Sequence, residues 1–161
     1  MHTMFQKKYR ELVDAEKYQE AIALAETRLC FDKTVRKWWR EWKAFCLIRL
    51  WRHEEAAAIY KRRLDFDPND PNALFPLSTT YLRYIKDYSL ALKYINKCLR
   101  ILEKNKEKFL GHYLIKGNIL RELWEYDLAI KFYLKEINKS HKWDNIQYVL
   151  KCIEECRDLL I

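Results

Sequence analysis

Four stretches of the chain share one pattern of hydrophobic and polar positions. They read YQEAIALAETRL from Tyr18, HEEAAAIYKRRL from His53, YSLALKYINKCL from Tyr88 and YDLAIKFYLKEI from Tyr126. Each opens with an aromatic ring, has an alanine three residues later and carries a large aliphatic residue eleven residues after its start. The starts are 35, 35 and 38 residues apart, and self-similarity at this period predicts a stack of helical repeats.

A second apolar-periodic segment of helical length precedes each stretch, at about residues 3–15, 35–50, 73–86 and 110–123. Each unit is therefore expected to be a helix A, a short turn and a helix B, packed closely at the small alanine. We expect one domain, residues 1–161, with units at about 3–33, 34–69, 70–104 and 109–140. An amphipathic helix at about 144–160 is expected to cap the last unit.

The composition agrees with an all-helical chain. With 2 glycines and 3 prolines among 161 residues, the chain has little of the turn chemistry that β-hairpins need. The same scarcity of glycine excludes the Gly-rich phosphate loops of nucleotide-binding folds. Half of the residues are hydrophobic, which is enough to build a buried core.

The segment HYLIKGNILRELWEYDLAIKFYLKEI, residues 112–137, resembles a unit of the tetratricopeptide repeat family. At the family's spacing it carries Tyr113, Gly117, Asn118, Tyr126, Ala129 and Tyr133. LDFDPNDPNA, residues 64–73, is similar to the family's linker between repeats, where Pro68 ends a helix B. The resemblance implies an all-α, right-handed α-solenoid of four helix pairs plus a C-terminal capping helix. It also implies that the A helices line a concave surface that binds peptides.

On that alignment the concave groove would present aromatic side chains edged by arginines. The expected aromatic residues are Trp38, Trp42, Phe45 and Tyr84, and the expected polar residues are Arg10, Arg49, Arg83, Asn118 and Arg121. Arginines at the ends of helices also complement the helix dipole, so a purely structural role for them stays open. Within KWWREWK, residues 37–43, the helical wheel assigns Trp39 to the core and leaves Trp38 and Trp42 open between core and groove.

Some family members grip a C-terminal carboxylate with lysines, asparagines and an arginine spread over three units. The corresponding sites here carry Gln6, Arg10, Trp42, Ala73 and Leu77, and only Asn118 has a matching residue type. Recognition of a chaperone's acidic C-terminus is therefore not expected.

The sequence contains no residue pattern that is typical of a catalytic or a metal-binding site. The four histidines fall in different units, and Cys152 and Cys156, four residues apart on one helix, lack a histidine to complete a metal site. We therefore expect buried structural thiols, no cofactor and no enzymatic activity. The five cysteines form no C-x-x-C pair, and no apolar leader or bilayer-spanning run is visible, which predicts a cytoplasmic protein.

These features predict a protein–protein interaction module, an adaptor or chaperone, that binds an acidic and apolar peptide or helix of a partner protein. The net charge of +8 and the pI near 9.2 keep two alternatives open. One is an immunity-type protein that neutralises a toxin domain, and the other is a basic helical repeat that binds nucleic acid. A monomer or a homodimer is expected, with no membrane partner.

Overall fold

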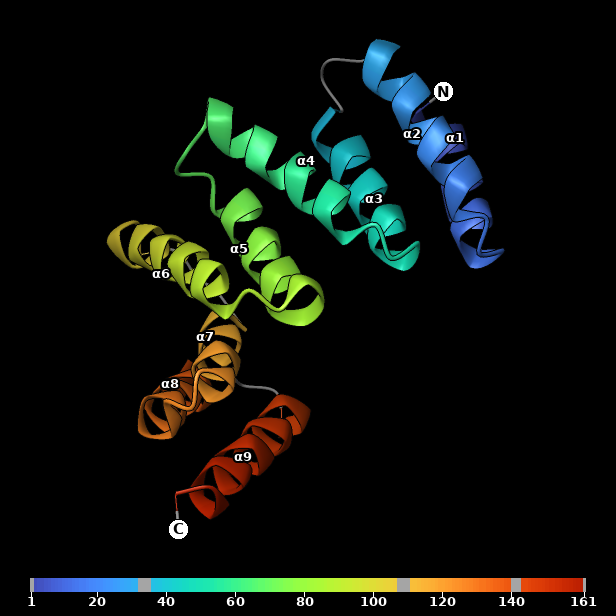
Figure 1. The fold of residues 1–161 in the computed structure, drawn as a ribbon. Helices are drawn as coiled ribbons and strands as arrows, with labels where there is room; N and C mark the ends of the chain where they lie inside the picture. Colours follow the sequence, from blue (N-terminus) through green and yellow to red (C-terminus); the bar gives the residue numbers. More distant parts are fainter. Residues whose placement is uncertain (1, 32–35, 107–110, 140–142, 161) are drawn as a thin grey trace. The chain divides into compact units, whose positions relative to one another are not determined.

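The computed structural model describes residues 2–31, 36–106, 111–139 and 143–160, and every regular element in these ranges is helical (Figure 1). The elements are α1 (His2–Asp14), α2 (Tyr18–Phe31), α3 (Arg36–Arg49), α4 (His53–Phe66), α5 (Pro71–Thr80), a π-helical turn (Tyr81–Ile85), α6 (Tyr88–Lys104), α7 (His112–Glu122), α8 (Tyr126–Lys139) and α9 (Trp143–Asp158). The predicted all-α fold of four helix pairs and a terminal helix is confirmed. No helix in the described ranges is both long and apolar enough to cross a bilayer.

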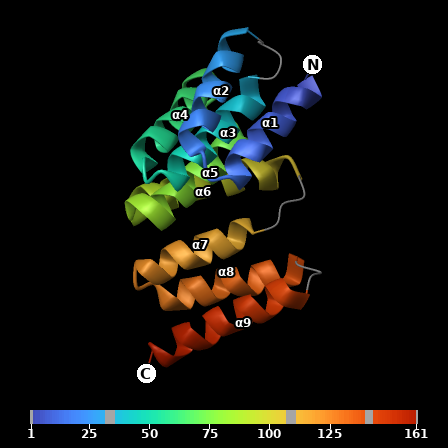
Figure 2. The ribbon, with the colours of Figure 1, turned by 90° about the vertical axis from the view of Figure 1, so that its right-hand side faces the viewer.

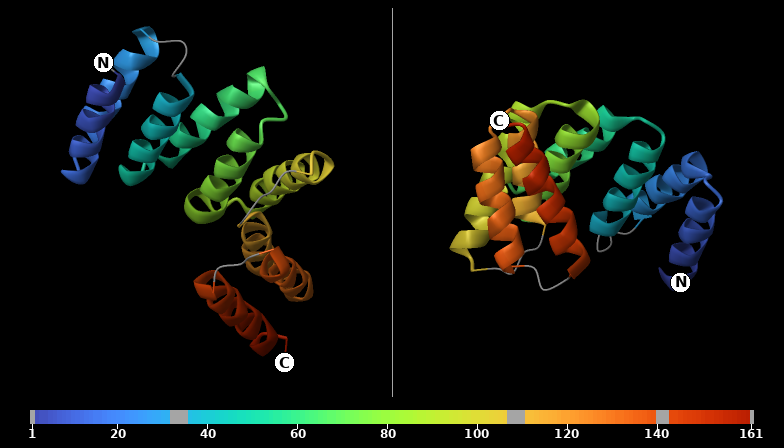
Figure 3. Two further views of the ribbon diagram at one scale, coloured as in Figure 1. Left: turned by 180° about the vertical axis from the view of Figure 1, so that it is seen from behind. Right: turned by 90° about the horizontal axis from the view of Figure 1, so that it is seen from below.

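The chain divides into two compact units, Met1–Arg62 and Arg63–Ile161, with the boundary inside α4. In the first unit, α2 packs against both α1 and α3 (Figure 3). In the second unit, α5 pairs with α6, and α8 packs against both α7 and α9 (Figure 2). Within each unit these helices pack against their neighbours in the sequence, as expected for a repeat array.

Each helix pair turns on one residue in the left-handed backbone conformation. This residue lies two positions before the aromatic residue that begins helix B, and in the four pairs it is Glu16, Trp51, Lys86 and Trp124, with φ between 56° and 66°. In three pairs the amide after it donates back to the carbonyl five residues earlier, for example from Glu125 N to Leu120 O at 2.9 Å. Such a bond closes the C-terminus of helix A and reverses the chain.

Small residues set the distance between the two helices of a pair. The four alanines of the repeat pattern are fully buried, and they are Ala21, Ala56, Ala91 and Ala129. In the last pair, a Cβ atom on Gly117 would lie 2.4 Å from Cε1 of Tyr133. The missing side chain therefore makes room for the tyrosine ring, whose hydroxyl donates to Asn118 Oδ1 at 2.8 Å.

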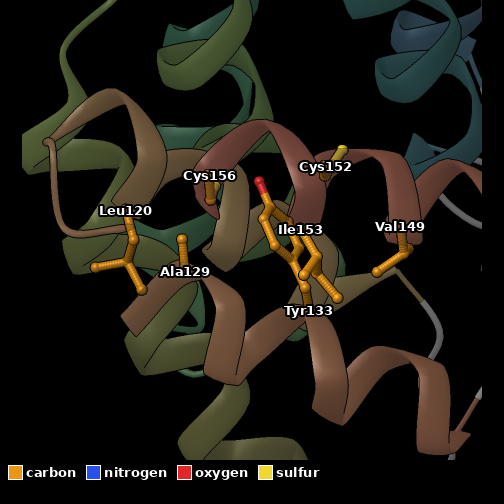
Figure 4. Close-up of a cluster of buried hydrophobic side chains, with 7 residues drawn as sticks. All are labelled: Leu120, Ala129, Tyr133, Val149, Cys152, Ile153 and Cys156. Carbon is orange, nitrogen blue, oxygen red and sulfur yellow. The ribbon is translucent and has the colours of Figure 1, made fainter. Parts of the chain in front are cut away.

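The terminal helix α9 covers the apolar face that α7 and α8 leave open. Seven buried side chains from these helices form one cluster, drawn in Figure 4: Leu120, Ala129, Tyr133, Val149, Cys152, Ile153 and Cys156. The Tyr133 ring points from α8 toward α9, where Cys152 and Cys156 lie (Figure 4). The predicted capping helix and the predicted packing role of the two thiols are confirmed.

One predicted helix is interrupted. The pattern predicts a single helix over residues 73–86, but α5 ends at Thr80 and Tyr81–Ile85 is π-helical. Pro76 has no N–H to donate within α5, and the Thr80 hydroxyl donates to the Pro76 carbonyl at 2.8 Å. Hydroxyl bonds of this kind often bend helices, and the wider turn begins at the residue that follows Thr80.

A buried carboxylate from α8 holds the start of α7. Glu136 is 4% exposed, and its Oε1 accepts a hydrogen bond from Gly111 N at 2.6 Å. Its Oε2 accepts a longer one from Leu114 N at 3.4 Å. The first amides of a helix lack intrahelical partners and carry partial positive charge, so Glu136 caps α7 from a neighbouring helix.

Candidate functional site

The nine residues predicted for the groove fall into two groups. Five lie in the first unit, on α1 and α3, and four lie in the second unit, in the π-helical turn and on α7. A groove shared by both groups stays a prediction, and each group is described within its own unit.

In the first unit, tryptophans join α1 to α3. Trp39 is 1% exposed and contacts Tyr9 and Trp42 edge-on, with ring centroids 6.2 and 4.8 Å away, so its predicted core position is confirmed. Trp42 stacks on Tyr9 at 4.5 Å, and the Tyr9 hydroxyl donates to the Trp42 carbonyl at 2.9 Å. Trp42 therefore belongs mainly to the contact between the two helices.

The outer face of α3, defined by the side chains of Trp38 and Phe45, is apolar and exposed. Trp38 is 56% exposed and Phe45 is 45% exposed. They are seven residues apart, close to two helical turns, so they share one face, and Arg49 follows one turn later. Arg49 Nε donates to the Tyr18 hydroxyl at 3.0 Å, and its guanidinium lies 5.5 Å from the centre of that ring. Arg10 is exposed on α1.

In the second unit, the predicted polar residues are engaged by neighbouring helices. Asn118 accepts the hydrogen bond from Tyr133 described above. Arg121 Nη1 donates to Glu155 Oε2 at 2.9 Å, and its Nη2 lies 3.8 Å from Glu122 Oε1. Arg121 thus forms ion pairs with two carboxylates, that of Glu155 on α9 and that of Glu122 on α7.

Arg83 and Tyr84 lie exposed in the π-helical turn. Burial and the Cys152 thiol raise the pKa of Tyr148 on α9, while the positive charges of Arg121 and Arg83 act in the opposite direction. The positive charges of both arginines therefore reach the phenol of Tyr148, a residue that was not predicted as part of a site. The terminal segment was expected only to cap the stack, so nothing pointed to a polar role for its outer face.

A cleft of about 790 Å³ opens where α7 turns into α8. Its lining comes from α6, α7, the turn, α8 and the end of α9: Tyr88, Arg121, Glu122, Trp124, Tyr126, Glu155, Asp158 and Leu159. Trp124 is 79% exposed, and its ring meets that of Tyr126 edge-on at 6.2 Å. Of this group sequence reasoning selected only Arg121. The available signal was that Trp51 and Trp124 occupy the same place in two repeats.

Among the described residues, no three His, Cys, Asp or Glu side chains gather in a way that could hold a metal ion. The polar groups of the cleft are carboxylates, hydroxyls and one guanidinium. Together with the aromatic rings, these groups are suited to binding a ligand through electrostatic and aromatic contacts.

No protein-family model and no curated protein matches the sequence. Solved structures do match. Residues 41 to the end of MamA from Desulfovibrio magneticus RS-1 align over 98% of this chain and 93% of that one, with a TM-score of 0.69 and 13% identity. A tetratricopeptide repeat protein from Parabacteroides merdae aligns over 97% and 60%, with a TM-score of 0.74 and 15% identity.

The first tetratricopeptide repeat domain of Spaghetti (RPAP3), bound to the HSP90 peptide SRMEEVD, aligns over 72% of this chain and 89% of that domain. Its TM-score is 0.61 and its identity 17%. At these identities the likeness shows the fold, which is that of the tetratricopeptide repeat.

Proposed function

We propose that this tetratricopeptide-repeat-like protein is a non-catalytic adaptor or chaperone that captures a peptide or helix of a partner protein. The first contact surface is the outer face of α3, with Trp38, Phe45 and Arg49. One observation carries the proposal: two large aromatic rings are about half exposed on a helix that buries Trp39, Ala44, Cys46 and Leu47 on its other side. Exposed rings of this size on one face are typical of protein-binding surfaces.

Burial of the two aromatic rings would contribute to the binding energy, and the nearby arginines would guide the approach of the partner. A large aromatic side chain buries roughly 150–250 Å² when fully covered. Covering the exposed half of one ring at about 25 cal/mol per Å² yields about 2–3 kcal/mol. Two such rings together yield about 4–6 kcal/mol, which offsets the lower estimates of the cost of association, and contacts from neighbouring residues must supply the net affinity. Arg49 and Arg10 would orient an acidic segment and speed its approach.

The chemistry of the partner differs from that of an acidic chaperone tail. The Spaghetti domain binds an HSP90 peptide, which supports peptide capture by this fold. In this chain, however, two of the positions that would grip a terminal carboxylate, Ala73 and Leu77, are fully buried. A third, Trp42, is stacked on Tyr9. We therefore place recognition on internal apolar and acidic side chains of the partner.

The test is site-specific photo-crosslinking in native lysate treated with nuclease. Benzoylphenylalanine replaces Trp38 in one variant and Leu134 in the control. Leu134 is an apolar residue of the second unit with a similar exposure of 46%. A discrete protein adduct from position 38 and none from position 134 is the expected result. The Trp38→Ser/Phe45→Ser variant should then weaken capture of that protein at least about 100-fold.

Thermal unfolding of the Trp38→Ser/Phe45→Ser variant provides the control for folding, and its midpoint should stay within a few degrees of wild type. Equal adducts from positions 38 and 134 would contradict a specific surface on α3. Adducts that vanish with nuclease treatment would replace protein binding by nucleic-acid binding.

A further inference from the structure

The cleft beside Trp124 has the size and composition of a binding site. Its volume of about 790 Å³ lies within the range of about 300–1,000 Å³ that is usual for ligand sites. Three aromatic rings, from Tyr88, Trp124 and Tyr126, line it together with charged side chains. All of these residues belong to the second unit, so the cleft is independent of the α3 face.

Trp124 occupies a position that the fold alone would not give to tryptophan. Its φ of 66° lies in the left-handed region, where a bulky side chain is strained and glycine or asparagine is favoured. Because it is 79% exposed, the ring recovers little of this cost by burial in the core. Trp51 has the same strained conformation in the first unit, so it is the place of the exposed Trp124 ring in the lining of the cleft that points to a binding role.

The cleft carries a surplus of negative charge in a chain whose net charge is +8. It contains one cation, Arg121, and three carboxylates, Glu122, Glu155 and Asp158. Arg121 lies between two of them, at 2.9 Å from Glu155 and 3.8 Å from Glu122. Desolvation and a hydrogen bond to Glu122 raise the pKa of Tyr88, so that phenol stays neutral and adds no charge to the cleft.

We propose that this cleft receives a lysine or arginine side chain of a partner protein. Aromatic rings attract a cation through their faces, and the carboxylates supply the compensating charge. The proposal goes beyond the function assigned to α3, because it concerns another unit and the opposite charge preference. Either surface can fail its test without affecting the other.

The test follows the indole N–H signal of Trp124 in a ¹⁵N-correlated NMR spectrum of the full chain. The chain has six tryptophans, and the signal of Trp124 is the one that disappears in Trp124→Asn. The probe is the blocked tripeptide acetyl-Gly-Arg-Gly-amide. Its matched control contains citrulline, which has the shape of arginine without the charge. A saturable shift with the arginine probe, and no saturable shift with citrulline, is expected.

Two pairs of variants locate the binding. Asp158→Asn removes one carboxylate of the cleft, and Glu154→Gln removes an exposed carboxylate on α9 that does not line it. Asp158→Asn should weaken probe binding roughly three-fold, and Glu154→Gln should leave it unchanged. Trp124→Asn should weaken it at least about three-fold, while Trp51→Asn, at the matching turn of the first unit, should not. For the two tryptophan variants, the amide signals of the cleft residues replace the indole signal as the readout.

Three results would overturn the proposal. They are equal shifts with arginine and citrulline, equal losses in Asp158→Asn and Glu154→Gln, and a wild-type dimer in sedimentation that Trp124→Asn converts to monomer. The last result would mean that the cleft is filled by a second copy of this chain.

Discussion

Glu136 caps α7 although it belongs to α8, and this contact can be tested with two substitutions. Glu136→Gln keeps the shape of the side chain and one acceptor oxygen but removes the charge. Glu136→Ala removes both acceptors and leaves the amides of Gly111 and Leu114 without the carboxylate. Comparing the two variants separates the charge from the hydrogen bonds.

The magnitudes follow from the geometry. Hydrogen bonds to a charged acceptor contribute about 1.5–3 kcal/mol and neutral ones about 0.5–1.5 kcal/mol. A negative charge at a helix N-terminus adds about 0.3–1 kcal/mol. Since the contact from Gly111 is 2.6 Å and that from Leu114 is 3.4 Å, most of the effect should lie at Gly111. We expect losses of about 1–2 kcal/mol for Glu136→Gln and about 3 kcal/mol for Glu136→Ala.

Amide hydrogen exchange is the decisive assay, because two compact units need not unfold in one transition. Exchange at the first turn of α7 should accelerate about ten-fold for each 1.4 kcal/mol lost. Exchange in the first unit should be unchanged, and Glu154→Gln, an exposed substitution on α9, serves as the control. If Glu136→Gln protects α7 as well as wild type does, the carboxylate charge has no part in the cap.

Three further predictions concern packing, the turn and the thiols. Gly117→Ala should destabilise the second unit by about 1–3 kcal/mol, because its Cβ would lie 2.4 Å from the Tyr133 ring; thermal melts test this, and Tyr133→Leu should rescue it. Trp124→Asn should stabilise the chain by about 1 kcal/mol by relieving the left-handed φ of 66°, and a lower melting midpoint would contradict this. Burial raises the pKa of Cys46 and of Cys156, so little thiolate should exist in the folded protein at pH 8. Alkylation mapped by mass spectrometry should therefore reach both thiols only under unfolding conditions.

The helix pairs could be predicted because their determinants are local. An aromatic residue opens each helix B, and an alanine three residues later packs against helix A, so α2, α4, α6 and α8 begin where the pattern starts. The burial of Trp39 was also predictable, since helical spacing places it beside Cys46 and Leu50 rather than on the face of Trp38 and Phe45.

Contacts between distant residues could not be predicted in this way. Glu136 lies 25 residues beyond the Gly111 amide it binds, and no periodicity marks a carboxylate as a cap for another helix. The cleft likewise brings Tyr88 and Asp158 to the same place from α6 and α9. The π-helical turn interrupts an apolar pattern that is otherwise regular, so the period of the sequence does not mark it.

Comparing the four turns between helices A and B shows which turn residues the fold requires and which are better explained by binding. Each places one residue in the left-handed conformation, and two of the four positions hold the solvated side chains Glu16 and Lys86. A turn of this geometry therefore does not require an aromatic ring. Trp51 and Trp124 are both about four-fifths exposed, at 83% and 79%, so core packing does not explain them either. Only Trp124 lines the acid-rich cleft, whereas Trp51 contacts His53 at 5.8 Å. If both asparagine variants gain stability and only Trp124→Asn loses the arginine peptide, recognition of a cation depends on the ring of Trp124 and not on the strain that it shares with Trp51.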